Sequence, residues 1–291
     1  MRNVAISVVL GFTGMLVVAI SAAGQSSTGA SNAARSPWKY YPMDRAIGDG
    51  GPAPKRDLTG TWAGPGSGAN VPRGSNNENP TAPPLTALGK QLYDRNKPIG
   101  KYSPGGTNDP HSRYCDPFGL PQNMTNEIRG MTITTLPNRT FILLQYMDVW
   151  REIWTDGRAL PTNVGGSGKD PLDPKYNGYS VGQWEDDYTF VVDTTGIEES
   201  TWATKNGYPH SIDAHVQERF HRDSKNDLTL TITMDDPKLY TKQFALGVEH
   251  FRWIPNQQLD EFTCIPSQVE QYLRELGDPA GSDPNAARQQ R

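Results

Sequence analysis

The sequence predicts a mainly β domain whose antiparallel strands close as an up-and-down barrel or pack as a sandwich. Long Pro/Gly-rich loops precede these strands and a short helix follows them. Two observations support this prediction. Between Met131 and Cys264, segments that alternate apolar and polar residues follow one another with short turns between them. The 291 residues also include 29 Gly and 24 Pro, which is typical of a loop-rich β protein.

The N-terminus predicts export. Arg2 supplies a positive charge, Val4 to Ala22 is an uncharged apolar run, and the following Ala23 and Gly24 are the small residues that a signal peptidase prefers. Residues 1–24 are therefore expected to be a cleaved signal peptide, which places the mature protein in the periplasm or outside the cell with no part inserted in the membrane. The alternative is a retained anchor, because a helix of about 20 apolar residues can span a bilayer.

The rest of the chain divides into three parts. Residues 25–56 are expected to form a flexible N-terminal segment, 57–276 a single β-rich domain, and 277–291 a disordered polar tail. The domain begins with a predicted strand at 57–63, and 64–84 is a loop of Gly, Asn and Pro.

Helices are predicted at two places. Residues 86–96 have an amphipathic pattern with Thr86 as the N-cap, and 266–276 should form a terminal helix. The segment 98–122 is expected to be irregular.

The alternating pattern predicts nine further strands, of which 227–235 is the clearest because its Leu, Ile and Met residues alternate with three Thr. The predicted strands span 131–136, 140–147, 149–155, 178–184, 188–194, 213–222, 227–235, 243–254 and 259–263.

Composition excludes several classes of partner. The net charge is −4 and no basic stripe is present, so nucleic acid and anionic membranes are poor partners. No Gly-rich phosphate loop stands beside a βαβ pattern, so no cofactor is predicted. His210, Asp213 and His215 lie close in sequence, but neither H-x-H nor H-E-x-x-H spacing occurs, so no metal site is predicted. A small molecule is the expected partner.

Two cysteines, Cys115 and Cys264, predict a disulfide in an oxidising compartment. The bond would join the Pro/Gly-rich first half to the end of the strand region. Closing so long a loop would stabilise the fold by about 4–5 kcal/mol on the chain-entropy model. Two unrelated buried thiols are the alternative.

Glu218 is the first candidate site residue. It shares a strand face with Ala214, Val216 and Phe220, and a carboxylate on an apolar face is unfavourable unless it is paired or used. Arg151, on the apolar face of its own strand, is the best partner. The pair is either a structural ion pair or part of a site.

A resemblance supports the barrel. Gly60-Thr61-Trp62 is similar to the G-x-W signature of lipocalin-like barrels. In that family the Trp packs at the closed end, often beneath an Arg from a late strand. The resemblance makes Arg252 the expected partner of Trp62, with a stacking energy of about 0.5–2 kcal/mol. The interval before the next predicted strand is too long for a simple lipocalin, so the resemblance extends to the barrel alone.

Further segments resemble a family of exported bacterial proteins with no assigned function. They are LTGTW at 58–62, PPLT at 83–86, WREIWTDGR at 150–158, GYSVGQWE at 178–185, GYPHS at 207–211 and DDPKLYTK at 235–242. One departure is Asp186, where such sequences usually carry Gly in a hairpin. The resemblance implies export and a β fold more than a chemistry.

Four further residues are candidates for the site. Asp156 and Arg158 form an Asp-Gly-Arg turn that is either structural or binds an anionic or carbonyl group. His210 lies on a Pro-braced loop that enters the Glu218 strand, as a capped surface residue or as a general acid or base. The site hypothesis places Glu218 inside the barrel below an opening lined by His210, Arg158 and Trp154.

Two function classes follow. The first is an exported small-molecule-binding barrel with an internal Glu/Arg/His polar site for a small apolar or aromatic ligand. The second is a cofactor-independent acid–base enzyme, a lyase, isomerase or hydrolase, in which His210 and Glu218 are catalytic. The expected ligand-binding residues are Arg151, Trp154, Asp156, Arg158, Tyr240 and Lys242.

We predict that the mature protein begins near Gly24 or Gln25, because an uncharged apolar run is followed at once by small residues. Intact-mass spectrometry of the periplasmic or culture fraction checks this. Recovery of the chain in the membrane fraction with Met1 still present would contradict it.

Overall fold

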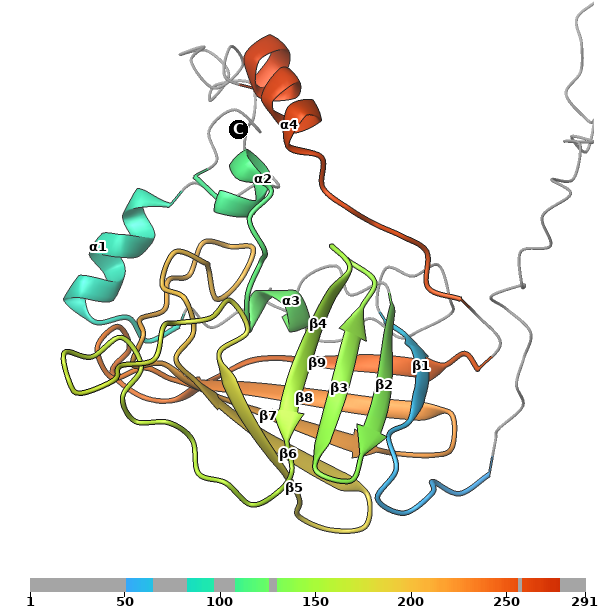
Figure 1. Ribbon diagram of the computed structural model, residues 1–291. Coiled ribbons are helices and arrows are strands. Elements are labelled where there is room, and N and C mark those ends of the chain that lie inside the picture. The colour runs from blue at the N-terminus through green and yellow to red at the C-terminus, as the bar shows by residue number, and fades with distance from the viewer. Residues whose placement is uncertain (1–50, 65–82, 97–107, 126–129, 256–257, 278–291) are drawn as a thin grey trace, which may run out of the picture. The chain divides into compact units, whose positions relative to one another are not determined.

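The computed structural model describes residues 51–64, 83–96, 108–125, 130–255 and 258–277 (Figure 1). The predicted signal peptide, most of the predicted flexible segment, and all but the first residue of the predicted tail lie outside these ranges.

Nine strands form a closed barrel in the order β1 to β9, with β1 paired to both β2 and β9 (Figure 1). The predicted mainly β fold is confirmed, as a barrel rather than a sandwich. The strands are β1 Gly60–Ala63, β2 Gly130–Leu136, β3 Arg139–Leu144, β4 Val149–Trp154, β5 Tyr179–Trp184, β6 Thr189–Thr195, β7 His215–Arg222, β8 Asp227–Asp235 and β9 Phe244–Trp253.

One pair of neighbouring strands departs from the predicted up-and-down pattern, because β4 and β5 are parallel. The long connection 155–178 carries the chain back along the barrel, as a parallel pairing requires. Only two register pairs join these strands, Ile153 with Ser180 and Trp154 with Val181. The other neighbouring strands pair in antiparallel fashion over longer stretches, apart from the short β1–β9 closure, so β4–β5 is a weak seam in the wall.

Two expectations about the segments outside the barrel were wrong. The predicted strand at 259–263 is absent, and only Phe262 forms an isolated bridge, with Tyr146. The segment 98–122, expected to be irregular, contains a short helix, α2 (Pro110–Tyr114), which Asp109 caps, and the start of α3 (Gln122–Thr125). Both segments are short, so their apolar residues are too few to show a helical or strand periodicity.

The two predicted helices are present. Thr86 caps α1 (Ala87–Arg95) by accepting a hydrogen bond from the Gly89 amide at 3.1 Å, as expected. The terminal helix is α4 (Pro266–Tyr272), which continues as a π-helical turn, η2 (Leu273–Gly277). Gly89 lets α1 approach the β8–β9 connection closely, because a Cβ there would lie 2.2 Å from the Leu239 carbonyl oxygen.

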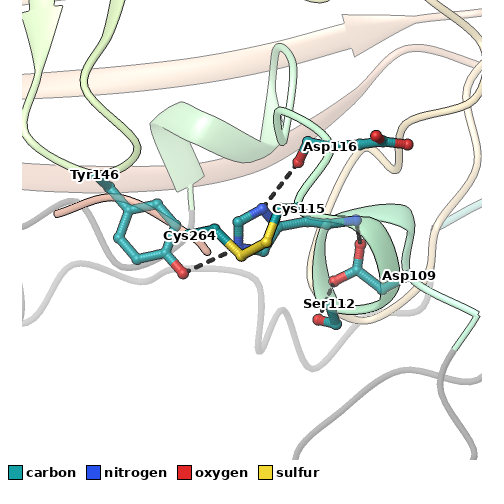
Figure 2. Close-up of a disulfide and its surroundings, with 7 residues drawn as sticks. Asp109, Ser112, Cys115, Asp116, Tyr146 and Cys264 are labelled. Atoms are coloured by element: carbon teal, nitrogen blue, oxygen red, sulfur yellow. Dashed lines mark hydrogen bonds between the residues drawn. A yellow bond between two sulfur atoms is a disulfide. The ribbon is translucent and has the colours of Figure 1, made fainter. Parts of the chain in front are cut away.

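The disulfide Cys115–Cys264 is confirmed (Figure 2). It joins the end of α2 to the segment before α4, across 149 residues, and these two helices contact each other. Beside it His111 is held on both ring nitrogens, by the Asp116 carbonyl oxygen at 2.9 Å and the Tyr146 hydroxyl at 3.2 Å. The disulfide therefore fixes the C-terminal segment against the α2 region.

Asp186 has a structural role in the turn between β5 and β6. Its side chain accepts hydrogen bonds from the amides of Tyr188 and Thr189, both at 2.7 Å, and so closes the β5–β6 hairpin. An Asx turn of this kind is a common alternative to Gly in a tight turn.

The Trp of the G-x-W motif is covered by a different arginine from the one expected. Trp62 is fully buried, and the guanidinium of Arg222 lies 4.9 Å from its ring. Arg222 also donates to the carbonyl oxygens of Asp57 and Lys225. The prediction of Arg252 was wrong, because inward-facing residues alternate along β9 and Phe251 takes the inward position, leaving Arg252 exposed.

We predict that Arg222→Ala lowers the free energy of unfolding by about 2–4 kcal/mol, because two backbone carbonyls lose a charged donor and Trp62 loses its cation. Arg252→Ala is the matched control. Its exposed ion pair with Asp227 at 3.3 Å should contribute less than about 1 kcal/mol. Urea denaturation measures both, and equal effects would refute the assignment.

Candidate functional site

An ion pair crosses the interior of the barrel. Arg151 on β4 donates from Nη1 to Glu218 Oε1 at 2.9 Å and from Nη2 to Oε2 at 2.7 Å. The two side chains are 1% and 0% exposed. Because β4 and β7 are not neighbours in the barrel, this contact must run through its interior. The predictions that Glu218 faces inward and that Arg151 balances it are both confirmed.

Two hydroxyls extend this pair around the wall. Ser180 on β5 lies 3.5 Å from Arg151 Nη2, and its hydroxyl is 2.8 Å from that of Thr194 on β6. Ser180 and Thr194 are both buried. The resulting polar chain contacts four consecutive strands, β4 to β7, within an otherwise apolar core.

The bidentate geometry limits what Glu218 can do chemically. Both of its oxygens accept a hydrogen bond from one guanidinium, which fixes the carboxyl group against Arg151. Arg151 is less completely satisfied, since its Nε has no hydrogen-bond partner among the described residues. Of the pair, the arginine therefore has capacity for a further interaction.

A second interior carboxyl was missed by the sequence analysis. Glu249 on β9 is 1% exposed and lies opposite the inward-facing Leu230. Its Oε1 has no hydrogen-bond partner within the described parts of the chain. Burial raises the pKa of Glu249 to about 8, against a smaller opposing effect of Lys205. The group is therefore protonated at neutral pH and is able to donate a hydrogen bond.

A signal for Glu249 was present in the sequence. It shares the parity of Phe251 along its strand, the same argument that selected Glu218. Along β9 as a whole, however, odd and even positions do not separate inward from outward residues, because a β-bulge shifts the β8–β9 register between Ile232 and Thr233. Inward positions are regular only beyond the bulge.

His210 is buried in the loop between β6 and β7. Its Nε2 lies 2.8 Å from the Thr201 hydroxyl and its Nδ1 3.4 Å from the Ser211 carbonyl oxygen. Burial lowers the pKa of His210, so the ring is neutral at pH 7. The adjoining Asp236 accepts from the Ser211 amide at 2.7 Å and hydroxyl at 2.9 Å. These contacts give His210 a structural setting, and none of them reaches Glu218.

The remaining predicted ligand-binding residues of this region lie apart from the ion pair. Tyr240 is buried and donates to the Pro209 carbonyl oxygen at 2.7 Å, while burial raises the pKa of its hydroxyl. Lys242 is exposed. Tyr240 therefore braces the His210 loop, and a ligand role for either residue stays a prediction.

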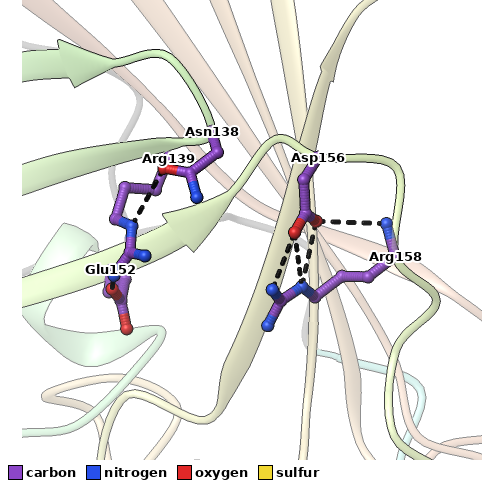
Figure 3. Close-up of polar contacts among 5 residues, drawn as sticks. All are labelled: Asn138, Arg139, Glu152, Asp156 and Arg158. Atoms are coloured by element: carbon purple, nitrogen blue, oxygen red, sulfur yellow. Dashed lines mark hydrogen bonds and ion pairs between the residues drawn. The ribbon is translucent and has the colours of Figure 1, made fainter.

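Trp154, Asp156 and Arg158 lie together, but on the outer side of the wall. Arg151 and Ile153 take the inward positions of β4, so Trp154 points outward. Arg158 stacks on the Trp154 ring at 3.4 Å. It also pairs with Asp156 at 2.7 Å, as Figure 3 shows. The expectation that Trp154 and Arg158 line an opening above Glu218 was wrong. Trp154 has the opposite parity to Arg151 on β4 and faces the other side of the sheet, and Arg158 packs on its ring there.

The chain is thus a closed, mixed nine-stranded β-barrel protein with ionisable groups buried in its interior. No protein-family model and no characterised protein matches it. None of the described helices has the length and apolarity needed to cross a bilayer. Within the described ranges, no group of three or more His, Cys, Asp and Glu could hold a metal ion.

We predict that Glu249→Gln raises the melting temperature increasingly as the pH rises. The pKa of Glu249 is about 8 in the folded chain and near 4.5 when exposed. The folded state therefore retains a proton that the unfolded state releases, so wild-type stability falls between these pH values and the loss is complete above the higher one. Gln does not titrate. By differential scanning calorimetry, the wild type and Glu249→Gln should have similar melting temperatures near the lower of these two pH values. A difference in melting temperature that stays constant between the two values would refute the burial of a titrating carboxyl.

Proposed function

We propose that this protein is an exported barrel that binds a small, largely apolar or aromatic molecule carrying a hydrogen-bond acceptor. The observation behind this proposal is Glu249, a buried carboxyl with an unpartnered oxygen inside the barrel. Buried polar groups in folded proteins nearly always have a partner, so an exception indicates a bound water or ligand.

Two other buried donors support the proposal. Arg151 Nε and Gln122 Nε2 also lack hydrogen-bond partners among the described residues. Gln122 is 1% exposed and begins α3, the helix that contacts β9, the strand of Glu249. A polar group of the ligand that accepted hydrogen bonds would satisfy such donors, while the surrounding Leu, Ile, Met and Phe side chains would enclose its apolar part.

The disulfide and the sequence of the N-terminus support the periplasm or the extracellular space as the location. Disulfides persist in oxidising compartments and are rare in the cytosol. Cys115–Cys264 is formed in this structure. The charge-free apolar run at the N-terminus supports the same location independently of the fold.

Cofactor-independent acid–base catalysis, by a lyase, isomerase or hydrolase, is the second candidate function, and one observation favours it. A carboxyl whose pKa is about 8 is suited to general acid catalysis near neutral pH. In that function Glu249 would transfer the proton. His210 and Glu218, assigned from the sequence, are engaged by Thr201 and Arg151.

The binding proposal is tested with Prodan, a neutral naphthalene whose carbonyl accepts hydrogen bonds and whose emission shifts to the blue in apolar surroundings. We expect saturable binding to the purified protein. Glu249→Leu removes the donor at similar volume and should weaken binding about 3- to 10-fold, the effect of one hydrogen bond. Glu249→Gln retains an N–H donor and should restore most of the affinity.

Two controls complete the test. Glu185→Leu removes a carboxylate from the outer surface and should leave Prodan binding unchanged. Wild-type affinity should fall as the pH passes about 8, where Glu249 loses its proton, and the Gln variant should not show this fall. Absence of saturable binding, or equal affinities of the wild type and Glu249→Leu, would overturn the proposal.

A further inference from the structure

A recess lies in the barrel wall at the β4–β5 seam, away from the interior ion pair. It encloses about 480 Å³, within the range of about 300–1,000 Å³ that small-molecule sites occupy. Its walls combine aromatic and polar side chains. Those used in the argument are Trp154, Arg158, Gln183, Trp184, Phe190 and Asp193.

The recess exists because the two strands part. β4 ends at Trp154, which pairs with Val181, whereas β5 continues to Trp184 with β6 on one side only. Gly182 lies beside this point, and a side chain there would project toward the interior residues Phe190 and Ile153. A Cβ on Gly182 would lie 2.4 Å from Cζ of Phe190, so the absence of a side chain lets the phenyl ring cover β5.

Trp154 forms one wall and is held rigidly. The guanidinium groups of Arg139 and Arg158 lie 3.8 and 3.4 Å from its ring, and two such groups cannot share one face at these distances. Each arginine is in turn fixed by an acid, Arg139 by Glu152 and Arg158 by Asp156 (Figure 3). The wall is therefore preorganised.

Trp184 supplies the aromatic surface. It has the inward parity of Ser180 along β5, and it reaches the recess because it ends that strand beyond the last residue of β4, where it stays partly exposed. Its ring contacts Phe190 with centroids 5.3 Å apart and an interplanar angle of 48°. Phe190 belongs to the core and is 2% exposed, which anchors the indole from behind. One face of the recess is thus a supported aromatic platform.

The two arginines of the recess each lie beside an acidic residue. Arg158 donates to both oxygens of Asp156, and Arg56 lies 3.6 Å from Asp187. Binding an anion there would compete with these acids. Arg158 Nη1 keeps a free N–H, since no described residue accepts from it.

Asp193 supplies the acceptor. Its Oδ1 lies 2.9 Å from His215 Nε2 and accepts from Gln217 Nε2 at 3.1 Å. Its Oδ2 has no hydrogen bond to any described residue. Beside it, Gln183 is exposed and offers both a donor and an acceptor. The recess therefore presents donors and acceptors together, and the charge of Arg158 is already paired with Asp156.

We propose that this recess binds a neutral saccharide, whose C–H face packs on Trp184 and whose hydroxyls bond to Asp193, Gln183 and Arg158. A sugar hydroxyl both donates and accepts, so it matches this mixed rim, and a sugar ring has an apolar face that fits a partly exposed indole. Anionic ligands are disfavoured by the paired arginines, and a purely apolar ligand would leave the rim unsatisfied.

The experiment uses an array of neutral oligosaccharides that also displays sulfated and carboxylated ones, followed by calorimetric titration of the tightest neutral sugar. We expect neutral sugars to bind, with an affinity that about 0.5 M NaCl leaves unchanged. Trp184→Ala should weaken binding more than about 10-fold. Asp193→Asn and Gln183→Ala should each weaken it about 3- to 10-fold.

Trp150→Ala is the matched control. Trp150 lies on the outer face of the same strand as Trp154 and is 61% exposed, but it does not line the recess, so binding should be unaffected. If Trp184→Ala fails to fold, the two polar variants decide the test. Binding of acidic sugars alone, binding of none, or equal loss in the Trp150 variant would overturn the proposal.

Discussion

The buried ion pair between Arg151 and Glu218 is the constraint that ties together two strands on opposite sides of the barrel interior. β4 and β5 share only two register pairs, so little backbone hydrogen bonding closes the wall there. The bidentate contact links β4 to β7 across the interior and compensates for that weakness. Removal of either partner would leave an isolated buried charge, which typically destabilises a protein by about 3–5 kcal/mol.

The β4–β5 seam also explains why polar side chains gather on both faces of this part of the barrel wall. Inward residues of β4 and β5, Arg151 and Ser180, enter the interior polar chain. Where β4 ends, β5 continues alone, and the recess with Trp154 and Trp184 forms on the wall. Glu249 stands apart, on β9, in a setting that keeps its carboxyl protonated at neutral pH.

Sequence reasoning worked where one local rule decided the outcome. Alternation placed Glu218 and Arg151 inside, and Thr86 was identified as a helix cap from residue type alone. It failed where an outcome depended on partners distant in sequence. Arg222 covers Trp62 because the end of β7 meets the segment before β1, and no local pattern distinguishes it from Arg252. The burial of Glu249 was missed because the bulge between Ala245 and Gly247 breaks the alternation over the strand as a whole, although Glu249 shares the parity of Phe251.

The sequence by itself predicted a mainly β domain, all the barrel strands, a disulfide as the simplest state of its two cysteines, and a charged pair on apolar faces. These follow from side-chain periodicity and residue chemistry, which act over a few residues. Only the tertiary structure decided the parallel seam, the separation of His210 and Trp154 from Glu218, and the burial of Glu249. Each of these depends on strand register and barrel closure, because pairing between distant segments sets which side chains meet.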